Sequence, residues 1–310
     1  MIGAGVIEAR GLRKAYGAVT AVDGVDLHVD AGELFSFVGP NGAGKTTTVE
    51  LVVGLRQRDG GSLRVLGVDP GDAEVGWRAR IGVVLQTSQL EPLLTVQESV
   101  ALVAGYYPAP RPVDDTIALV GLTEQANRRA GKLSGGQRRR LDLALAVVGN
   151  PELLFLDEPT TGFDPAARRH AWQLIRDLRA LGSTIFFTTH DMAEAQTLAD
   201  RVAVIVAGRI AATGPPAELA SRYRPASRIV FRLPSGIAAT ELPVGPGDSL
   251  ATAGDQIEIR TTRPEQVLHE LTGLAVTRRL RLFDLEVTRP SLESAYLALT
   301  EPASDPSPVP

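Results

Sequence analysis

The sequence predicts an α/β fold followed by a smaller α+β domain, and three observations support this prediction. Residues 1–222 alternate short apolar runs, typical of buried strands, with stretches of helical periodicity. A glycine-rich turn at residues 39–44 joins one of these strands to a helix. Near Tyr223 the pattern changes to shorter elements and to a stretch, 234–256, rich in proline and glycine.

In the first domain we expect strands that are alternating or continuously apolar, at 25–29, 33–38, 81–85, 152–156, 183–189 and 202–206. A helix should follow the glycine-rich turn over 44–55. Thr95 and Glu98 fit a capping box, which begins a mainly helical region over 95–148 with a helix at 135–148. Asp164 and Pro165 fit the N-cap and first position of another helix, which should end at Gly182.

The second domain is expected to span 223–300. We predict strands at 228–233, 257–260 and 275–288, with helices at 264–271 and 291–299, and we expect Gly273 to end the first of these helices. Four prolines in the last ten residues predict a disordered tail over 301–310.

Composition excludes several classes of protein. The chain has 310 residues, of which 44% are hydrophobic and 22% charged, as in folded proteins rather than disordered or fibrous ones. The absence of cysteine excludes disulfides, thiolate metal sites and thiol catalysis. The net charge of −4 leaves no strongly basic surface of the kind that binds nucleic acid.

The sequence also contains no candidate membrane segment. No apolar run approaches the roughly 18 residues that a membrane-spanning helix needs. The first ten residues lack the basic and then apolar layout of a signal peptide. We therefore expect a soluble chain whose role at a membrane, if it has one, depends on a partner.

The glycine-rich turn matches the phosphate-binding pattern GxxxxGK[ST], between a buried strand and a helix. Glycines allow the backbone amides to approach a phosphate closely, and the helix N-terminus faces the anion. Lys45 would add a positive charge at the outer phosphates, and the Thr46 hydroxyl could coordinate Mg²⁺. The residues of this loop are Gly39, Pro40, Asn41, Gly42, Ala43, Gly44, Lys45, Thr46 and Thr47.

Two acids end the apolar run at 153–156. Burying Asp157 and Glu158 at a strand end is costly unless a cation or a reacting proton lies nearby. Asp157 is suited to hold Mg²⁺, directly or through water, and Glu158 to act as a base that polarises attacking water.

A second anion site is predicted where Ser134, Gly135, Gly136 and Gln137 open a helix. A single phosphate site does not need two such loops, so this one could face another nucleotide.

With these motifs together, the chain resembles the ATP-binding subunit of an ABC transporter over about residues 5–220. Residues 39–47 are similar to the Walker A motif of that family, 133–137 to its LSGGQ signature and 153–158 to its Walker B motif. The resemblance implies a P-loop NTPase cassette, with a RecA-like core, an antiparallel β subdomain and a helical subdomain over about 95–148. A small C-terminal α+β domain would follow it.

The resemblance also implies roles for four further residues. Tyr16 resembles the aromatic residue that stacks on adenine, and Gln86 resembles the Q-loop glutamine that touches Mg²⁺ and water. Asp164 ends a segment similar to the D-loop, in which Phe163 stands where the family more often has leucine. His190 resembles the switch histidine that contacts the γ-phosphate, so the implied catalytic residues are Lys45, Glu158 and His190.

The mechanism implied by the resemblance is an ATPase that needs partners. Two cassettes, identical or different, would pair head to tail, with each ATP between one P-loop and the other cassette's residues 134–136. A separate polytopic membrane permease would provide the transport path, so the ATPase would lie at the cytoplasmic face of the membrane. Nucleic acid is not an expected partner.

The end of the second domain bears on the direction of transport. Residues 287–297 resemble the C-terminal signature of daunorubicin-type and multidrug-resistance export ATPases, which move drugs, lipids or glycans outward. The domain could instead only stabilise the dimer. An importer ATPase, a non-transport ABC ATPase of the translation or repair type, and a regulatory subunit without catalysis remain alternatives. Intact Lys45, Glu158 and His190 argue against the last of these.

Overall fold

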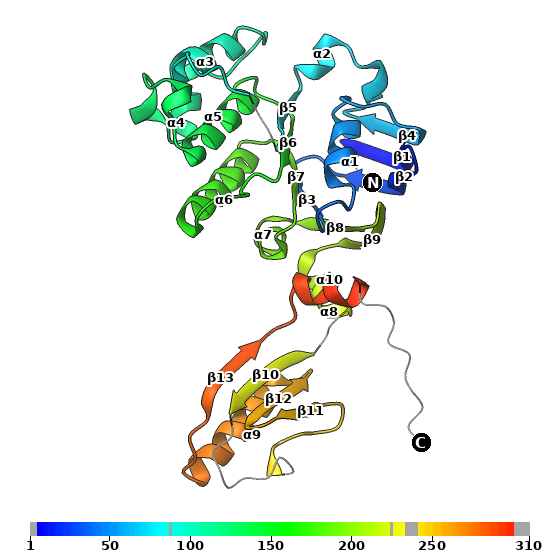
Figure 1. Cartoon of the computed structure of the whole chain (residues 1–310), viewed down its shortest axis with the longest axis vertical. Helices are drawn as coiled ribbons and strands as arrows, with labels where there is room; N and C mark the ends of the chain where they lie inside the picture. The colour runs from blue at the N-terminus through cyan, green and yellow to red at the C-terminus, as the bar shows by residue number, and fades with distance from the viewer. Residues whose placement is uncertain (1–4, 87–88, 224–225, 233–240, 301–310) are drawn as a thin grey trace. The chain divides into compact units, whose positions relative to one another are not determined.

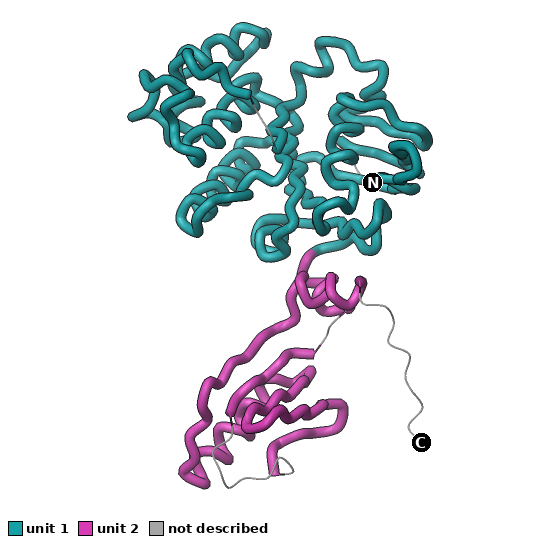
Figure 2. Tube along the Cα trace, viewed as in Figure 1, with its two compact units in different colours: residues 1–215 teal, residues 216–310 magenta. Residues whose placement is uncertain are grey.

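The computed structural model describes residues 5–86, 89–223, 226–232 and 241–300 (Figure 1). The chain forms two compact units, residues 1–215 and 216–310, which are coloured separately in Figure 2. The expected boundary at 222 lies at the end of helix α8 (Pro216–Tyr223), whereas the division between the units lies just before this helix. The expected tail, 301–310, lies outside the described residues.

The first unit is built on a six-stranded sheet with the order β5-β6-β7-β3-β8-β9. Its strands are parallel except for β9, which pairs antiparallel with β8. Their bounds are β3 (Leu34–Val38), β5 (Ile81–Val84), β6 (Leu153–Asp157), β7 (Thr184–Thr189), β8 (Arg201–Val206) and β9 (Arg209–Gly214). A three-stranded antiparallel sheet, β2-β1-β4, packs beside it, with β1 (Ile7–Tyr16), β2 (Val19–Val29) and β4 (Gly60–Val65).

In chain order, helices lie between the successive strands of the six-stranded sheet from β3 to β8. They are α1 (Lys45–Val52), α2 (Val75–Arg78), α3 (Val96–Ala104), α4 (Val113–Leu119), α5 (Gly135–Val147), α6 (Pro165–Ala180) and α7 (Met192–Leu198), with short 3₁₀ turns η1 (Pro70–Asp72), η2 (Thr123–Gln125) and η3 (Ala130–Lys132). The capping box expected at Thr95 and Glu98 is confirmed, since each side chain bonds the other residue's backbone amide. Asp164 caps α6, as expected.

Both faces of the six-stranded sheet are covered. Alternate residues of β6 enter different cores: Leu153 and Phe155 pack with the small sheet and α1, whereas Leu154 and Leu156 pack with α3 to α6. All five residues of β6 are buried. This double coverage explains why the strand is continuously apolar rather than alternating.

The second unit contains a four-stranded antiparallel sheet with the order β11-β12-β10-β13. Its elements are β10 (Ser227–Arg232), β11 (Ser249–Ala253), β12 (Gln256–Thr261), β13 (Phe283–Thr288), α8, α9 (Pro264–Thr277) and α10 (Leu292–Thr300). Buried residues of β10, β12 and α9 form its core. The fold class is therefore the one predicted, a mixed α/β cassette with a C-terminal α+β unit.

Three expectations for the second unit are wrong. Helix α9 continues through Gly273, because Val267, Leu271 and Ala275 follow at four-residue spacing and are all buried on one face. The strand expected at 275–288 begins only at Phe283, after the end of this longer helix. The stretch predicted as loop over 234–256 contains β11, whose mostly exposed residues carry no apolar alternation.

Candidate functional site

The phosphate-binding loop lies between the end of β3 and the start of α1. Gly44 has φ of 105°, and a Cβ there would lie 2.2 Å from the carbonyl oxygen of Ala21. At Gly39 a Cβ would lie 2.5 Å from the carbonyl oxygen of Ile205. Neighbouring strands therefore leave room only for glycine at both positions.

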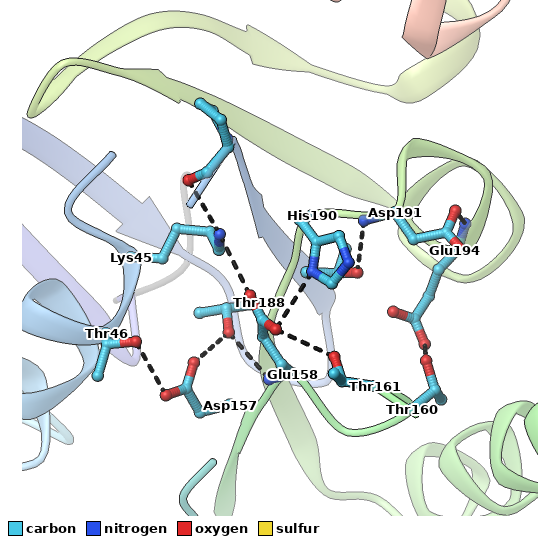
Figure 3. A network of polar contacts seen from close by, with 12 residues as sticks. Lys45, Thr46, Asp157, Glu158, Thr160, Thr161, Thr188, His190, Asp191 and Glu194 are labelled. Carbon is cyan, nitrogen blue, oxygen red and sulfur yellow. Dashed lines mark hydrogen bonds and ion pairs between the residues drawn. The ribbon is translucent and has the colours of Figure 1, made fainter. Parts of the chain in front are cut away.

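Lys45, the first residue of α1, turns its ammonium back over this loop (Figure 3). Its Nζ donates to the carbonyl oxygens of Gly39, at 2.8 Å, and Pro40, at 3.1 Å. It also lies 3.3 Å from Oε1 of Glu158. The side chain is only 5% exposed, so its charge is balanced at short range by these oxygens.

Thr46 faces the carboxyl end of β6. Its Oγ1 donates to Oδ2 of Asp157 at 3.2 Å, while Oδ1 of Asp157 accepts from Thr188 at the end of β7 (Figure 3). Hydroxyl and carboxylate oxygens are the ligands that Mg²⁺ prefers. Thr46 and Asp157 therefore fit a site for this ion. Among the described residues, no group of three or more His, Cys, Asp or Glu side chains could hold a metal by itself.

Glu158 is held by contacts on both its backbone and its carboxylate. Its φ of 49° lies in the left-handed region, where a residue with a side chain is strained. Its amide donates to Thr188, and its Oε2 accepts from Thr161 at 3.0 Å. Nδ1 of His190 lies 3.2 Å from the same oxygen.

The ionised form of Glu158 is favoured despite burial. Burial alone would raise its pKa, but the hydrogen bond from Thr161, the charge of Lys45 and the contact with His190 outweigh it. The pKa of Glu158 therefore lies below its ordinary value.

His190 follows β7 directly and is 45% exposed on its side chain. The next residue, Asp191, caps α7 by accepting from the amides of Ala193 and Glu194, and it also pairs with Arg168 of α6. The histidine is therefore positioned between a rigid strand and a capped helix, with its ring reaching Glu158.

The signature residues form a second capping box. Ser134 Oγ accepts from the amide of Gln137, and the Gln137 side chain accepts from the amide of Ser134. A Cβ at Gly135 or Gly136 would meet nothing within 4 Å, and neither residue has a positive φ. The fold of this chain therefore does not itself require glycine at these two positions.

Tyr16, Gln86 and Asp164 lie outside the network of Figure 3. Tyr16 ends β1, is 41% exposed and lies beside the cations of Lys14 and Arg56. Gln86 follows β5 and is exposed. Asp164 accepts from two amides at the start of α6.

The structure brings Lys45, Thr46, Asp157, Glu158 and His190 together at the carboxyl edge of β3, β6 and β7. The other residues of the loop follow β3, with Thr47 in the first turn of α1 and the rest between β3 and α1: Gly39, Pro40, Asn41, Gly42, Ala43 and Gly44.

Sequence reasoning missed four residues of this region. Thr188 and Thr161 hold the two acids, and Glu194 accepts from Thr160 and Trp172 through one buried oxygen. Threonines within the apolar run of β7 were the available signal for Thr188. The fourth residue, Arg139, gave no local signal, since it lies among three consecutive arginines.

Comparison with known proteins is consistent with this geometry. Residues 22–161 match the ABC transporter family, and residues 227–291 match the C-terminal domain of ABC transporter domain-containing proteins. The chain is 37% identical to the daunorubicin/doxorubicin resistance ATP-binding protein DrrA of Streptomyces peucetius, across 97% of this chain and 94% of that protein. It is 34% identical to the linearmycin resistance ATP-binding protein LnrL of Bacillus subtilis, across 95% and 98%.

A third relative is the Nod factor export ATP-binding protein I of Burkholderia pseudomallei (strain 1710b), 37% identical across 95% of this chain and 96% of that protein. Among solved structures, an ATP-binding subunit of an ABC transporter superposes with a TM-score of 0.64 at 25% identity, covering 70% of this chain and 93% of that one. The dimeric cassette MJ0796 bound to ADP and Pi gives 0.62 at 26% identity, covering 67% and 98%.

The described residues contain no helix with the length and apolar character needed to cross a membrane. The full-length relatives, the two family matches and the cassette geometry agree with one another. The chain belongs to the ATP-binding subunits of ABC transporters, close to DrrA, LnrL and the Nod factor export ATP-binding protein I, and it is an ATPase that hydrolyses ATP for transport.

Proposed function

We propose that Glu158 is the general base of ATP hydrolysis and that the reaction powers export through a separate membrane permease. The observation that supports this role most directly is the buried contact between Lys45 and Glu158, with His190 on the other oxygen of the same carboxylate. Glu158 is ionised in this environment, so its carboxylate can accept a hydrogen bond from an attacking water molecule.

In this mechanism the backbone of residues 39–45 binds the phosphates of ATP, and Lys45 places its charge at the outer ones. Glu158 orients a water molecule and accepts its proton as the water oxygen bonds to the γ-phosphorus. The bond from that phosphorus to the bridging oxygen breaks, and ADP carries away the electron pair. His190 holds the carboxylate in place and contacts the γ-phosphate. Tyr16 would stack on the adenine, and Gln86 would lie beside the attacking water.

Mg²⁺ would be held by Thr46 and Asp157, with Gln86 nearby. When bound, it would neutralise charge on the β- and γ-phosphates.

The second ATP contact is proposed to come from a partner cassette. Gly135 and Gly136 open a helix of 13 residues, and open space surrounds the positions where their Cβ atoms would be. Neither turn geometry nor packing within this chain explains these glycines, whereas close approach of a phosphate from another subunit does. Ser134, Gln137 and the D-loop residue Asp164 would complete this contact. The dimeric cassette MJ0796 is a structural precedent for such a pair.

Export is supported by the relatives that match along nearly the whole chain, including the C-terminal unit. Their names describe resistance to daunorubicin, doxorubicin and linearmycin, or export of Nod factor. We propose that this chain likewise drives outward movement of drugs, lipids or other hydrophobic or glycan cargo. It would act at the cytoplasmic face of the membrane, bound to a polytopic permease and paired with an identical or different cassette.

The substitution Glu158→Gln tests the catalytic role. It should abolish ATP turnover while leaving ATP-dependent pairing intact, measured by phosphate release and by size-exclusion chromatography with ATP. The matched control is Glu152→Gln, since Glu152 lies at the other end of the same strand and pairs with Arg80 at the surface. Normal turnover in Glu158→Gln would sink the catalytic assignment.

The transport role is tested by purifying the chain from membranes and identifying the permease that accompanies it. Everted membrane vesicles that contain both proteins should accumulate a probe such as daunorubicin when ATP is added, and Glu158→Gln should prevent this. Uptake by right-side-out cells that depends on the same ATPase would favour an importer instead.

A further inference from the structure

Arg139, on α5 two residues after Gln137, reaches from the signature helix to the backbone at the ends of two strands. Its Nη1 donates to the carbonyl oxygen of Leu85 at 2.6 Å, just after β5. Its Nη2 donates to the carbonyl oxygen of Asp157 at 2.7 Å and lies 3.3 Å from that of Glu158. One half-buried side chain thus holds the chain at both acids and beside Gln86.

The shape of arginine suits this connection. Its guanidinium is planar and carries five donors in a fixed fork, so it can bond carbonyl groups of different strands at the same time. Lysine carries its donors on a single nitrogen, so it would have to reach both strand ends from one point. The neighbouring Arg140 bonds the carbonyl oxygen of Gly121, within the helical region, and makes no contact of this kind in the described structure.

The contact lies at the most strained point of the catalytic segment. Glu158 has a left-handed φ of 49°, a conformation that persists only where surrounding contacts determine it. Thr188 binds the amide of Glu158, and Arg139 binds the carbonyl groups of residues 157 and 158. The peptide group before Glu158 is therefore held from both β7 and α5, and the peptide group after it is held from α5.

Apolar packing is not directional, so it does not fix the carbonyl groups beside Glu158 in the way that hydrogen bonds do. A cavity of about 440 Å³ lies between α5 and α6, and Arg139, Leu143, Pro159 and Leu174 are among the residues that line it. Beside this cavity, Leu141 and Ala144 of α5 pack in the same core as Leu156 of β6. The hydrogen bonds of Arg139 cross this edge of the cavity and connect α5 to the segment that carries the acids.

We propose that Arg139 is a positioning residue that couples the signature loop to the alignment of Glu158. The paired cassette holds an ATP whose phosphate would contact Gly135 and Gly136 of this chain and so orient α5. The guanidinium of Arg139 would transmit that orientation to the backbone that carries the catalytic carboxylate. This inference rests on the proposed role of Glu158 in hydrolysis. The proposed link lies within one subunit. It joins the signature loop, which contacts the ATP held by the paired cassette, to Glu158, which acts on the ATP held by this chain.

The test compares Arg139→Gln, Arg139→Lys and the matched control Arg140→Gln in the full chain. Displacing a catalytic group by about 1 Å can cost on the order of 100-fold, so we expect kcat of Arg139→Gln to fall roughly 10- to 100-fold. The KM for ATP and the affinity measured by a fluorescent ATP analogue should stay within about threefold of wild type. Arg139→Lys should keep most of the defect, and Arg140→Gln should keep turnover within about twofold of wild type.

A double-mutant cycle with Glu158→Asp distinguishes a positioning role of Arg139 from a purely structural one. The aspartate shortens the side chain at position 158 by one methylene group and so withdraws the carboxylate. If Arg139 acts by aligning this carboxylate, Arg139→Gln should reduce the residual turnover of Glu158→Asp by less than about threefold, because the effects are not additive. Additive losses, an equal defect in Arg140→Gln, or full rescue by lysine would overturn the proposal. Normal kcat in Arg139→Gln would also overturn it, whereas normal turnover in Glu158→Gln would overturn the proposed function instead.

Discussion

Nζ of Lys45 lies 3.3 Å from Oε1 of Glu158, and the two side chains are 5% and 8% exposed. A cation of the phosphate-binding loop and an acid at the end of β6 thus neutralise each other in a buried site. Phosphate groups that reach Lys45 compete with Glu158 and with the loop's own carbonyl groups. Nucleotide binding should therefore change the electrostatic surroundings of Glu158, the proposed general base.

Replacing Lys45 by alanine should impair both binding and stability. The ammonium that faces the phosphates is lost, and Glu158 remains buried with one partner fewer, at a cost of about 1–3 kcal/mol in the free energy of unfolding. Urea denaturation and ATP titration measure the two effects. The control is Arg209→Ala, which breaks a surface ion pair with Asp23 and should change stability by less than about 1 kcal/mol. Equal changes in both variants would contradict the role of the buried pair.

The depressed pKa of Glu158 predicts a particular pH dependence of stability. Because this pKa lies below the ordinary value of 4.5 in the folded state, ionised Glu158 stabilises the fold above that pH. The contribution is lost as the pH falls below 4.5 and through the folded-state pKa. The difference in free energy of unfolding between wild type and Glu158→Gln should therefore shift against wild type between pH 6 and pH 3. A difference that is constant over this range would contradict the prediction.

Gly135→Ala and Gly136→Ala should separate stability from activity. Both positions have ordinary φ and open space for a Cβ, so each alanine should stabilise the helix start by about 0.5–1 kcal/mol. If a phosphate of the paired cassette approaches there, turnover should fall on the order of 10- to 100-fold. Gly76→Ala, in α2, has the same open surroundings and is the matched control, with similar stabilisation and normal turnover. Full activity in the signature variants would argue against contact from a second cassette.

Glu194 is a buried acceptor whose loss should destabilise the segment after Glu158. One oxygen accepts from both Thr160 Oγ1 and Trp172 Nε1, and the residue is 1% exposed. Glu194→Leu orphans both donors and should cost about 1–3 kcal/mol for each that stays buried. Glu194→Gln keeps the acceptor oxygen and should lose less than half as much, as measured by urea denaturation. A glutamine variant as unstable as the leucine variant would show that charge, not the acceptor, matters.

The sequence by itself determined the class of fold and the kind of site. The loop at 39–47, the acids after an apolar strand and the signature at 133–137 each carry their chemistry in a short run of residues, and local patterns also predicted the caps at Thr95 and Asp164. Local sequence signals did not predict the end of a helix correctly where burial of its next turn outweighs them. Gly273 was expected to end a helix, yet α9 continues because its next turn buries Ala275.

Only the tertiary structure decided which groups meet. Asp157 reaches Thr46 and Thr188 because the sheet order places β6 beside β7 and β7 beside β3, and the register pairs Asp157 with Thr188. No pattern within one segment encodes that order, since it depends on which apolar faces pack together. The same is true of Arg139, one of three adjacent arginines, because the packing of α5 on the sheet decides which of them reaches the carbonyl groups beside Glu158.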